Sequence, residues 1–148
     1  MDGLSSEIEK RRLIERRLSH SNALMKSFLQ SIPDLVFYKD LEGKYLDCNK
    51  AFASFHSLEV KQIIGKTDKD LFPSSDLEVF MASDKEVLGT GKKIKLEMWG
   101  TWPDGKRVLF ETHKNPILSD NNEIIGVIGI SRDITERHFD KMELQKAK

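Results

Sequence analysis

The sequence contains a single cysteine, Cys48, and this scarcity limits the chemistry open to the chain. One cysteine cannot form an internal disulfide, and no pair of cysteines or histidines has the spacing of a zinc site. Such a composition is typical of a reducing compartment, and we expect a cytoplasmic location. The sequence also lacks any run near the roughly 18 apolar residues of a membrane span, so we expect no membrane contact by this stretch.

An excess of charge of either sign is also absent. Lys and Arg number 24, Asp and Glu also number 24, and the formal net charge is zero. No long-range field therefore attracts nucleic acid or an anionic membrane, and we expect no nucleic-acid partner. With 148 residues and 39% hydrophobic content, the chain is long enough for one globular domain and an appendage.

Catalytic signatures are missing as well. The sequence has no nucleophile elbow, P-loop, metal-binding helix or glycine-rich dinucleotide fingerprint. Its four histidines, one of which is His138, form no constellation with the carboxylates. The residues around His138 also lack the Glu-Leu-Arg/Lys-x-Pro surroundings that would resemble a histidine-kinase phosphoacceptor site. We therefore expect that this stretch is not an enzyme.

The first 30 residues predict an N-terminal helix. Residues 6–30 contain neither Gly nor Pro, and Ser6 with Glu9 has the spacing of a capping box. Apolar residues follow a heptad pattern that Glu7, Arg11 and Ser21 interrupt. The mixed charges elsewhere favour a solvated coiled-coil flank over a DNA-reading helix. We interpret residues 1–30 as a coiled-coil or cap helix of a homodimer, with these dimer-forming residues: Ile14, Leu18, Met25 and Phe28.

The rest of the chain alternates strand-like and helix-like patterns. Two short apolar runs, 34–39 and 44–48, flank a turn at residues 40–43 and predict a hairpin. Asn49 is a candidate helix cap before several short helices, one of them ended by Gly65. A longer helix is expected from a capping box at Ser75 and Glu78 to a stop at Gly89.

Three further strand-like runs occupy the last third of the chain. Turn clusters at Pro103–Lys106 and Ser119–Asn122 separate them, and the second run is expected to end before Asn115-Pro116. The last run, Ile124 to Ile130, carries branched apolar residues on both faces, so both faces must be covered. If the third strand is regular, Trp99 and Trp102 lie on opposite faces, and one of them packs against a helix.

A helix is expected to begin directly after the last strand. Asp133 and Thr135 are short polar residues able to cap exposed amide groups and fix the angle at which this helix leaves. We interpret this pair as a signal junction, with a capping pair that has no signalling role as the alternative. Residues 136–148 are rich in helix formers, and we expect them to begin a signalling helix followed by an effector.

Four segments together resemble the PAS family. They are Ile32-Pro33-Asp34, Asn49-Lys50-Ala51-Phe52, Trp102-Pro103-Asp104-Gly105 and the stretch from Gly126 to Thr135, which ends in Asp-Ile-Thr. The resemblance covers residues 28–138. It implies an α+β fold over residues 31–135, with a five-stranded antiparallel sheet in the order 2-1-5-4-3 and short helices on one face. It also implies a bacterial sensory module placed before an output such as a diguanylate cyclase or histidine kinase.

In the PAS family, one sheet face and the short helices enclose a pocket that holds haem, flavin, a carboxylic acid or nothing. A photoreactive flavin is disfavoured here, because residues 67–72 contain no cysteine and Cys48 is interpreted as a small, half-buried apolar residue. Haem is disfavoured because residues 76–88 contain no histidine, although His56 and His113 stay open as edge or pocket residues. We expect a small organic ligand or none. Strand parity and helix position give eight candidate pocket residues: Phe37, Phe52, Phe55, Leu71, Met81, Met98, Phe110 and Ile128.

The sequence therefore predicts a sensory and dimerisation domain that transmits ligand or upstream state through the Asp-Ile-Thr junction. The alternative is a ligand-free relay module that only aligns subunits, with side chains filling the pocket. Composition does not separate the two.

Overall fold

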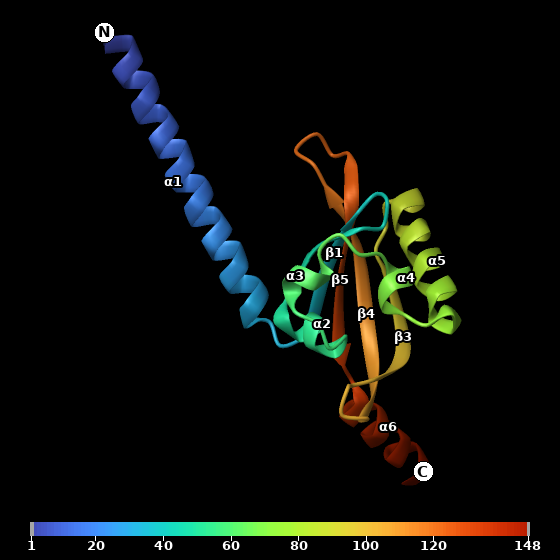
Figure 1. Cartoon of the computed structure of the whole chain (residues 1–148). Coiled ribbons are helices and arrows are strands. Elements are labelled where there is room, and N and C mark those ends of the chain that lie inside the picture. Colours follow the sequence, from blue (N-terminus) through green and yellow to red (C-terminus); the bar gives the residue numbers. More distant parts are fainter. Residues whose placement is uncertain (1, 148) are drawn as a thin grey trace. The chain divides into compact units, whose positions relative to one another are not determined.

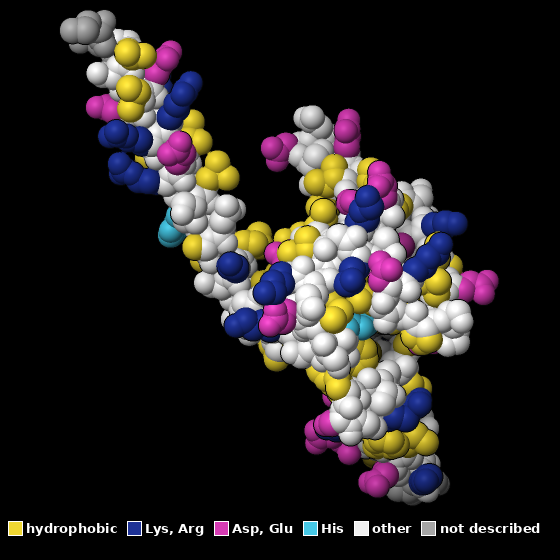
Figure 2. Space-filling model, viewed as in Figure 1, with side chains coloured by type: hydrophobic (Ala, Val, Ile, Leu, Met, Phe, Trp, Pro, Cys, Tyr) yellow, Lys and Arg dark blue, Asp and Glu magenta, His cyan; other side chains and the backbone are white. Residues whose placement is uncertain are grey.

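The computed structural model describes residues 2–147, and the chain divides after Ile32 into two units that are described separately. The first unit consists of helix α1, Asp2–Ser31. This helix begins before Ser6, so the expected capping box lies inside it and does not start it. The predicted dimer residues Ile14, Leu18, Met25 and Phe28 are 56–60% exposed. Figure 2 shows apolar side chains along α1 interleaved with charges of both signs. The coiled coil itself stays a prediction.

The second unit contains the sheet and the remaining helices (Figure 1). Its elements follow in this order: β1 (Leu35–Asp40), β2 (Tyr45–Cys48), α2 (Lys50–Phe55), α3 (Val60–Ile63), α4 (Asp68–Leu71), α5 (Ser74–Thr90), β3 (Ile94–Thr101), β4 (Arg107–Leu118), β5 (Ile124–Asp133) and α6 (Thr135–Ala147). The five strands form one antiparallel sheet in the order β2-β1-β5-β4-β3, which confirms the expected fold. Helices α2 to α5 lie over one face, here called the inner face (Figure 1). Among the described residues, no helix has both the length and the apolar content of a membrane span.

Asn49 fixes the start of the helical segment, as its position predicted. Its side-chain oxygen accepts from the backbone N–H of Phe52 and also from that of Val36 in β1. Its amide nitrogen donates to the carbonyl of Asp34 at 2.7 Å. One buried side chain therefore caps α2 and joins it to the first strand.

Helix α5 differs from the prediction at both ends. Pro73 occupies the N-cap position and makes no side-chain capping bond, so the expected box at Ser75 and Glu78 is wrong. Gly89 lies inside the helix, which ends at Gly91 in the left-handed conformation with φ +69°. A glycine at the C-terminus of a helix adopts this conformation without the strain of a Cβ atom.

Strand β4 is longer than predicted, because it continues through Asn115 and Pro116 to Leu118. Strand β3 begins at Ile94, opposite Lys114, so it does not reach Pro116, while β5 pairs with β4 through Pro116 and beyond. Pro116 therefore lies where β4 has a partner on one side only, which is where a strand tolerates a missing N–H.

The main core lies between the inner sheet face and helices α2 and α3. Phe37, Tyr45, Phe52, Ile63 and Val108 are all less than 9% exposed. The ring of Phe37 lies directly over Gly129 of β5, and a Cβ atom on that glycine would overlap the ring. Burying each such large side chain contributes roughly 1.5 to 3 kcal/mol. The core thus fixes the sheet against the helices that enclose the site.

Candidate functional site

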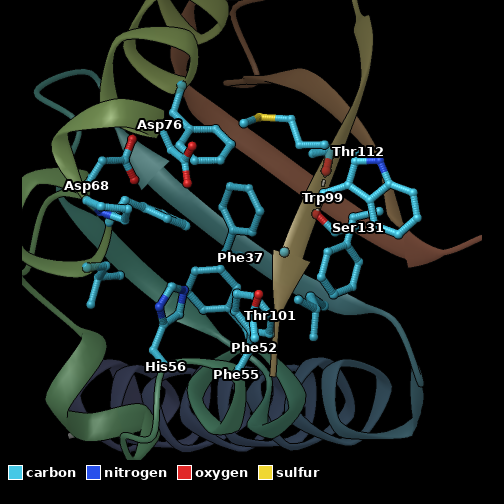
Figure 3. A pocket seen from close by; sticks show the side chains of 18 of the residues that line it. Phe37, Phe52, Phe55, His56, Asp68, Asp76, Trp99, Thr101, Thr112 and Ser131 are labelled. Carbon is cyan, nitrogen blue, oxygen red and sulfur yellow. Dashed lines mark hydrogen bonds between the residues drawn. The ribbon is translucent and has the colours of Figure 1, made fainter. Parts of the chain in front are cut away.

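A cavity of about 640 Å³ lies between the inner sheet face and helices α2, α4 and α5 (Figure 3). Its volume is in the range of small-molecule sites in proteins. Six of the eight pocket residues predicted from the sequence line it: Phe37, Phe52, Phe55, Leu71, Met98 and Phe110. Whether they bind a ligand stays a prediction.

The other two predicted pocket residues lie elsewhere. Met81 lines a second cavity of about 300 Å³ beside α5. Lys39 and Asp84 also line this second cavity. Ile128 is wrong by strand parity. Gly129 pairs with Phe37 and Ser131 pairs with Leu35, and both of these pairs face the cavity side. Since side chains alternate along a strand, Ile128 points to the outer face.

Aromatic rings form much of the cavity wall. The ring centroids of Phe37 and Phe52 are 4.9 Å apart, and those of Phe55 and Phe110 are 5.3 Å apart. At the α4–α5 side, Phe72 lies 4.4 Å from Phe80. These tilted and edge-on arrangements are the favourable geometries for aromatic pairs. The wall therefore offers several ring faces and edges to a bound molecule.

His56 sits among these rings at the end of α2. Its imidazole lies 4.7 Å from Phe52 and 4.9 Å from Phe72. Burial lowers the pKa of His56 from 6.5 to about 4, with Asp68 opposing that shift, so the ring is neutral at neutral pH. Its Nε2 atom is buried and has no hydrogen-bond partner. Of the two histidines left open by the sequence, His56 lines the cavity, whereas His113 bonds to Glu111.

Two lysines, two aspartates and a tyrosine form a buried charge network next to the cavity. Lys39 of β1 donates to Asp68 of α4 at 2.9 Å and also to Asp84 of α5. Lys114 of β4 donates to Asp84 at 2.7 Å, and the hydroxyl of Tyr45 donates to Asp68. Lys39 and Lys114 are each 1% exposed. The network joins the sheet to both helices and balances two positive charges with two negative ones.

Burial shifts the pKa of two members of this network, Tyr45 and Lys114. It raises the pKa of Tyr45 well above 10, and the adjacent Asp68 carboxylate raises it further. Burial and the neighbouring Lys39 lower the pKa of Lys114, while Asp84 raises it. Each lysine is held by at least one carboxylate, so the three salt bridges of the network join groups that are desolvated together.

Sequence reasoning missed this network. Lys39 follows Leu35 and Phe37 at two-residue intervals in β1, and Lys114 follows Phe110 and Thr112 at the same interval in β4. That two-residue period placed both lysines on the inner face and was the available signal. Their partners lie 29 to 45 residues away in sequence, so no local pattern connected them.

The two tryptophans contact different parts of the molecule. Trp102 contacts Phe55 at 5.2 Å on the inner side. Trp99 contacts His138 and Phe139 of α6 at centroid distances of 5.7 and 6.3 Å, and so packs against a helix. Trp99 also borders the cavity (Figure 3).

Cys48 is fully buried in the core, and burial raises its pKa to about 12. It is a small packed side chain, as the sequence indicated, but it is fully buried and not half-buried. Within residues 2–147, no group of three His, Cys, Asp or Glu side chains is arranged to hold a metal ion.

The junction between the last strand and the exit helix is short and bonded to β4. One residue, Ile134, separates β5 from α6, and its backbone N–H donates to the carbonyl of Leu109 at 2.9 Å. The Thr135 hydroxyl accepts from the N–H of Leu109 and donates to Asp133. The Asp133 carboxylate also accepts from the N–H of Thr135 at 3.0 Å. Asp133 and Thr135 therefore cap the helix and attach it to the sheet.

A charged pair also holds the first turn of α6. Arg137 donates to Glu111 of β4 at 2.9 Å. The pKa of Glu111 is lowered by hydrogen bonds from His113 and Arg137, in that order of importance. Strand β4 thus contacts α6 through Leu109 and Glu111, while its alternate residues Phe110 and Thr112 line the cavity.

The comparisons with known proteins agree with this architecture. The family model described as PAS fold matches residues 29–138. The aerobic respiration control sensor protein ArcB of Escherichia coli is 28% identical over 126 residues, which are 85% of this chain and 16% of ArcB. A diguanylate cyclase of Vibrio cholerae is 30% identical over 131 residues, which are 87% of this chain and 41% of the cyclase. A solved structure of VqmA bound to DPO superposes with a TM-score of 0.70 at 24% identity, covering 78% of this chain and 58% of that one.

The chain belongs to the PAS-fold family. It is homologous to PAS domains of sensor histidine kinases and of a diguanylate cyclase, and it spans well under half the length of either relative named above. A PAS domain is a sensory module, and this stretch is not itself catalytic.

Proposed function

We propose that this chain is the sensory module of a cytoplasmic bacterial signalling protein, in which a small organic ligand in the cavity biases the exit helix α6. The observation that carries this proposal is the double role of β4. Phe110 and Thr112 face the cavity, whereas Leu109 and Glu111, which alternate with them along the strand, hold Thr135 and Arg137 of α6. A shift of β4 caused by a ligand is felt at both sets of contacts, because they share one backbone.

A ligand needs only a modest preference to act through such a link. A difference of about 1 to 3 kcal/mol in affinity between two conformations shifts their populations enough for regulation. A few contacts with aromatic rings and polar groups of the wall are sufficient for that difference. One solved structure of this fold is described as VqmA bound to DPO, and we propose that this chain also binds a ligand.

The output is proposed to be an effector in the same polypeptide. The relatives include a sensor kinase and a diguanylate cyclase, both much longer than this chain. Helix α6 begins one residue after the sheet and carries exposed Phe139, Met142 and Leu144. Phe139 and Met142 are three residues apart and share one side of the helix, as in a helical pair, whereas Leu144 lies on another side.

We further propose that α1 pairs with its copy in a homodimer through Ile14, Leu18, Met25 and Phe28. Large exposed apolar side chains at heptad spacing support this pairing. Light scattering on the chain with Leu18→Glu should give a monomer mass under conditions where the unchanged chain gives a dimer. A dimer mass for both chains would contradict the proposed interface.

Native mass spectrometry of protein purified from cells tests the ligand proposal. A reproducible added mass of a small molecule, lost on mild denaturation, is expected. Repeated apo masses, combined with unchanged output on mutation of the cavity wall, would favour the alternative of a ligand-free relay that only aligns subunits.

A further inference from the structure

Within the described residues, His56 Nε2 is the one buried side-chain nitrogen or oxygen atom that lacks a hydrogen-bond partner. An unpaired buried polar atom costs free energy, so natural structures contain few of them, and a molecule bound at the site is one way to supply the missing partner. His56 lines the cavity, and the ring of Phe52 lies beside it (Figure 3). A bound molecule with a polar atom at this position would satisfy the imidazole.

The surroundings of His56 favour a flat partner. Three aromatic rings, those of Phe52, Phe55 and Phe72, lie within 5.2 Å of its ring centroid. Phe37 and Phe110 continue this wall across the sheet. Ring faces and edges at these positions contact a planar aromatic molecule better than a flexible chain, because aromatic groups gain from offset and edge-on packing.

The charges around the cavity favour an uncharged molecule. The buried cations Lys39 and Lys114 are already matched by Asp68 and Asp84. Asp76 adds a further carboxylate to the lining, and the exposed Arg107 lies over the ring of Trp99 at the rim. A carboxylate or phosphate inside the cavity would therefore find no unmatched buried cation, and its desolvation would be uncompensated.

We propose that the cavity takes a small, uncharged, planar aromatic molecule whose polar atom hydrogen-bonds to His56 Nε2. The proposal rests on the ligand-sensing function above and assigns its ligand class and a specificity-determining residue. A neutral imidazole nitrogen either donates or accepts, and a hydroxyl group on the ligand satisfies it in both cases. The low pKa of His56 agrees with this assignment, because a neutral ring does not attract an anion.

Three probes with one ring system test the proposal on the whole chain: naphthalene, 2-naphthol and 2-naphthoate. Their dissociation constants are measured by NMR titration of the labelled protein. We expect 2-naphthol to bind about fivefold or more tightly than naphthalene, the gain of one hydrogen bond between neutral groups, and more tightly than 2-naphthoate. In His56→Phe, the preference for 2-naphthol over naphthalene should disappear while naphthalene still binds, which also shows that the variant retains the cavity.

The alternative results are distinct. Equal affinities for naphthalene and 2-naphthol in the unchanged chain would overturn the role of His56. Tightest binding of 2-naphthoate would overturn the uncharged class, but ligand sensing would stand. If none of the three probes binds, this inference is overturned. The proposed sensing function would still stand if native mass spectrometry found a bound molecule of another class.

Discussion

The hydroxyl oxygen of Thr135, at the start of the exit helix α6, lies 2.9 Å from the backbone nitrogen of Leu109 in β4. Because the same hydroxyl donates to Asp133 in β5, one side chain bonds both strands at the point where α6 begins. The helix is therefore attached to the sheet by bonds to two neighbouring strands and not by the peptide connection alone.

Replacing Thr135 with valine should weaken this attachment. The change removes the hydroxyl but keeps the shape, and it leaves the N–H of Leu109 without its acceptor. We expect the free energy of unfolding in urea to fall by about 1 to 2 kcal/mol. The matched control is Thr135→Ser, which keeps the hydroxyl. If valine and serine variants are equally stable, the bond between α6 and β4 contributes nothing.

Removing the charge of Asp84 should disrupt the buried network. In Asp84→Asn, Lys39 and Lys114 lose their shared carboxylate while both stay 1% exposed. Breaking a buried ion pair in this way leaves an uncompensated charge, and we expect a loss of about 3 kcal/mol in chemical denaturation.

The control for Asp84 is Glu42→Gln. It removes the exposed pair of Glu42 with Lys44, whose atoms are 3.6 Å apart, and should change stability by less than about 1 kcal/mol. Similar losses in the two variants would mean that the network around Asp84 is not energetically distinct from a surface pair.

His56 should make stability depend on pH. Its pKa of about 4 in the folded chain lies below the ordinary value of 6.5, so the unfolded chain takes up the proton more readily. The stability from the neutral ring is complete above pH 6.5 and is lost as the pH falls toward 4, amounting to about 2 to 3 kcal/mol. Unfolding curves between pH 7 and 4 should show a larger loss of stability in the unchanged chain than in His56→Phe. The carboxylates are the same in both chains, so the difference between the two losses reports the imidazole. Parallel pH profiles would contradict the buried, neutral state of His56.

Two glycine-to-alanine changes should have opposite effects. At Gly129, a methyl group would overlap the ring of Phe37, and we expect a loss of about 1 to 3 kcal/mol as the ring is displaced. At Gly89, inside α5, a methyl group meets nothing within 4 Å, and we expect a gain of about 0.5 kcal/mol from helix propensity. Thermal unfolding of both variants checks the signs. A neutral Gly129→Ala would show that Phe37 does not need this close approach.

Much of the fold followed from local patterns. Turn residues such as Asp104 and Gly105 separated the strands, and Asn49 and Gly65 marked helix ends that the structure retains. The strand order came from the resemblance to the PAS family and is confirmed. The sequence predicts a helix end at Gly89, because a glycine gives the same local signal inside a helix and just beyond it. Only the left-handed conformation of Gly91 in the folded chain shows which of the two glycines ends α5.

The site was predictable only where side-chain alternation was clear. Phe37 and Phe110 lie in strands whose faces differ, and their placement on the cavity wall followed from parity. In β5 both faces are apolar, so the side-chain pattern does not indicate whether Ile128 or its neighbours face the cavity. The pairing of Phe37 with Gly129 shows that Ile128 faces the other side. The charge network depends on contacts between distant segments, which a linear pattern does not contain.

Residue-specific hydrogen exchange of the native chain tests the central claim, that sheet and exit helix form one mechanical unit. The relevant amides are those of Ile134, which bonds to the carbonyl of Leu109, and of Leu109, which bonds to Thr135. We predict opening free energies for both within about 1 kcal/mol of the amides in the β4–β5 ladder, because they open with the sheet. Exchange of Ile134 and Leu109 near the unprotected rate, while the ladder stays protected, would contradict the account.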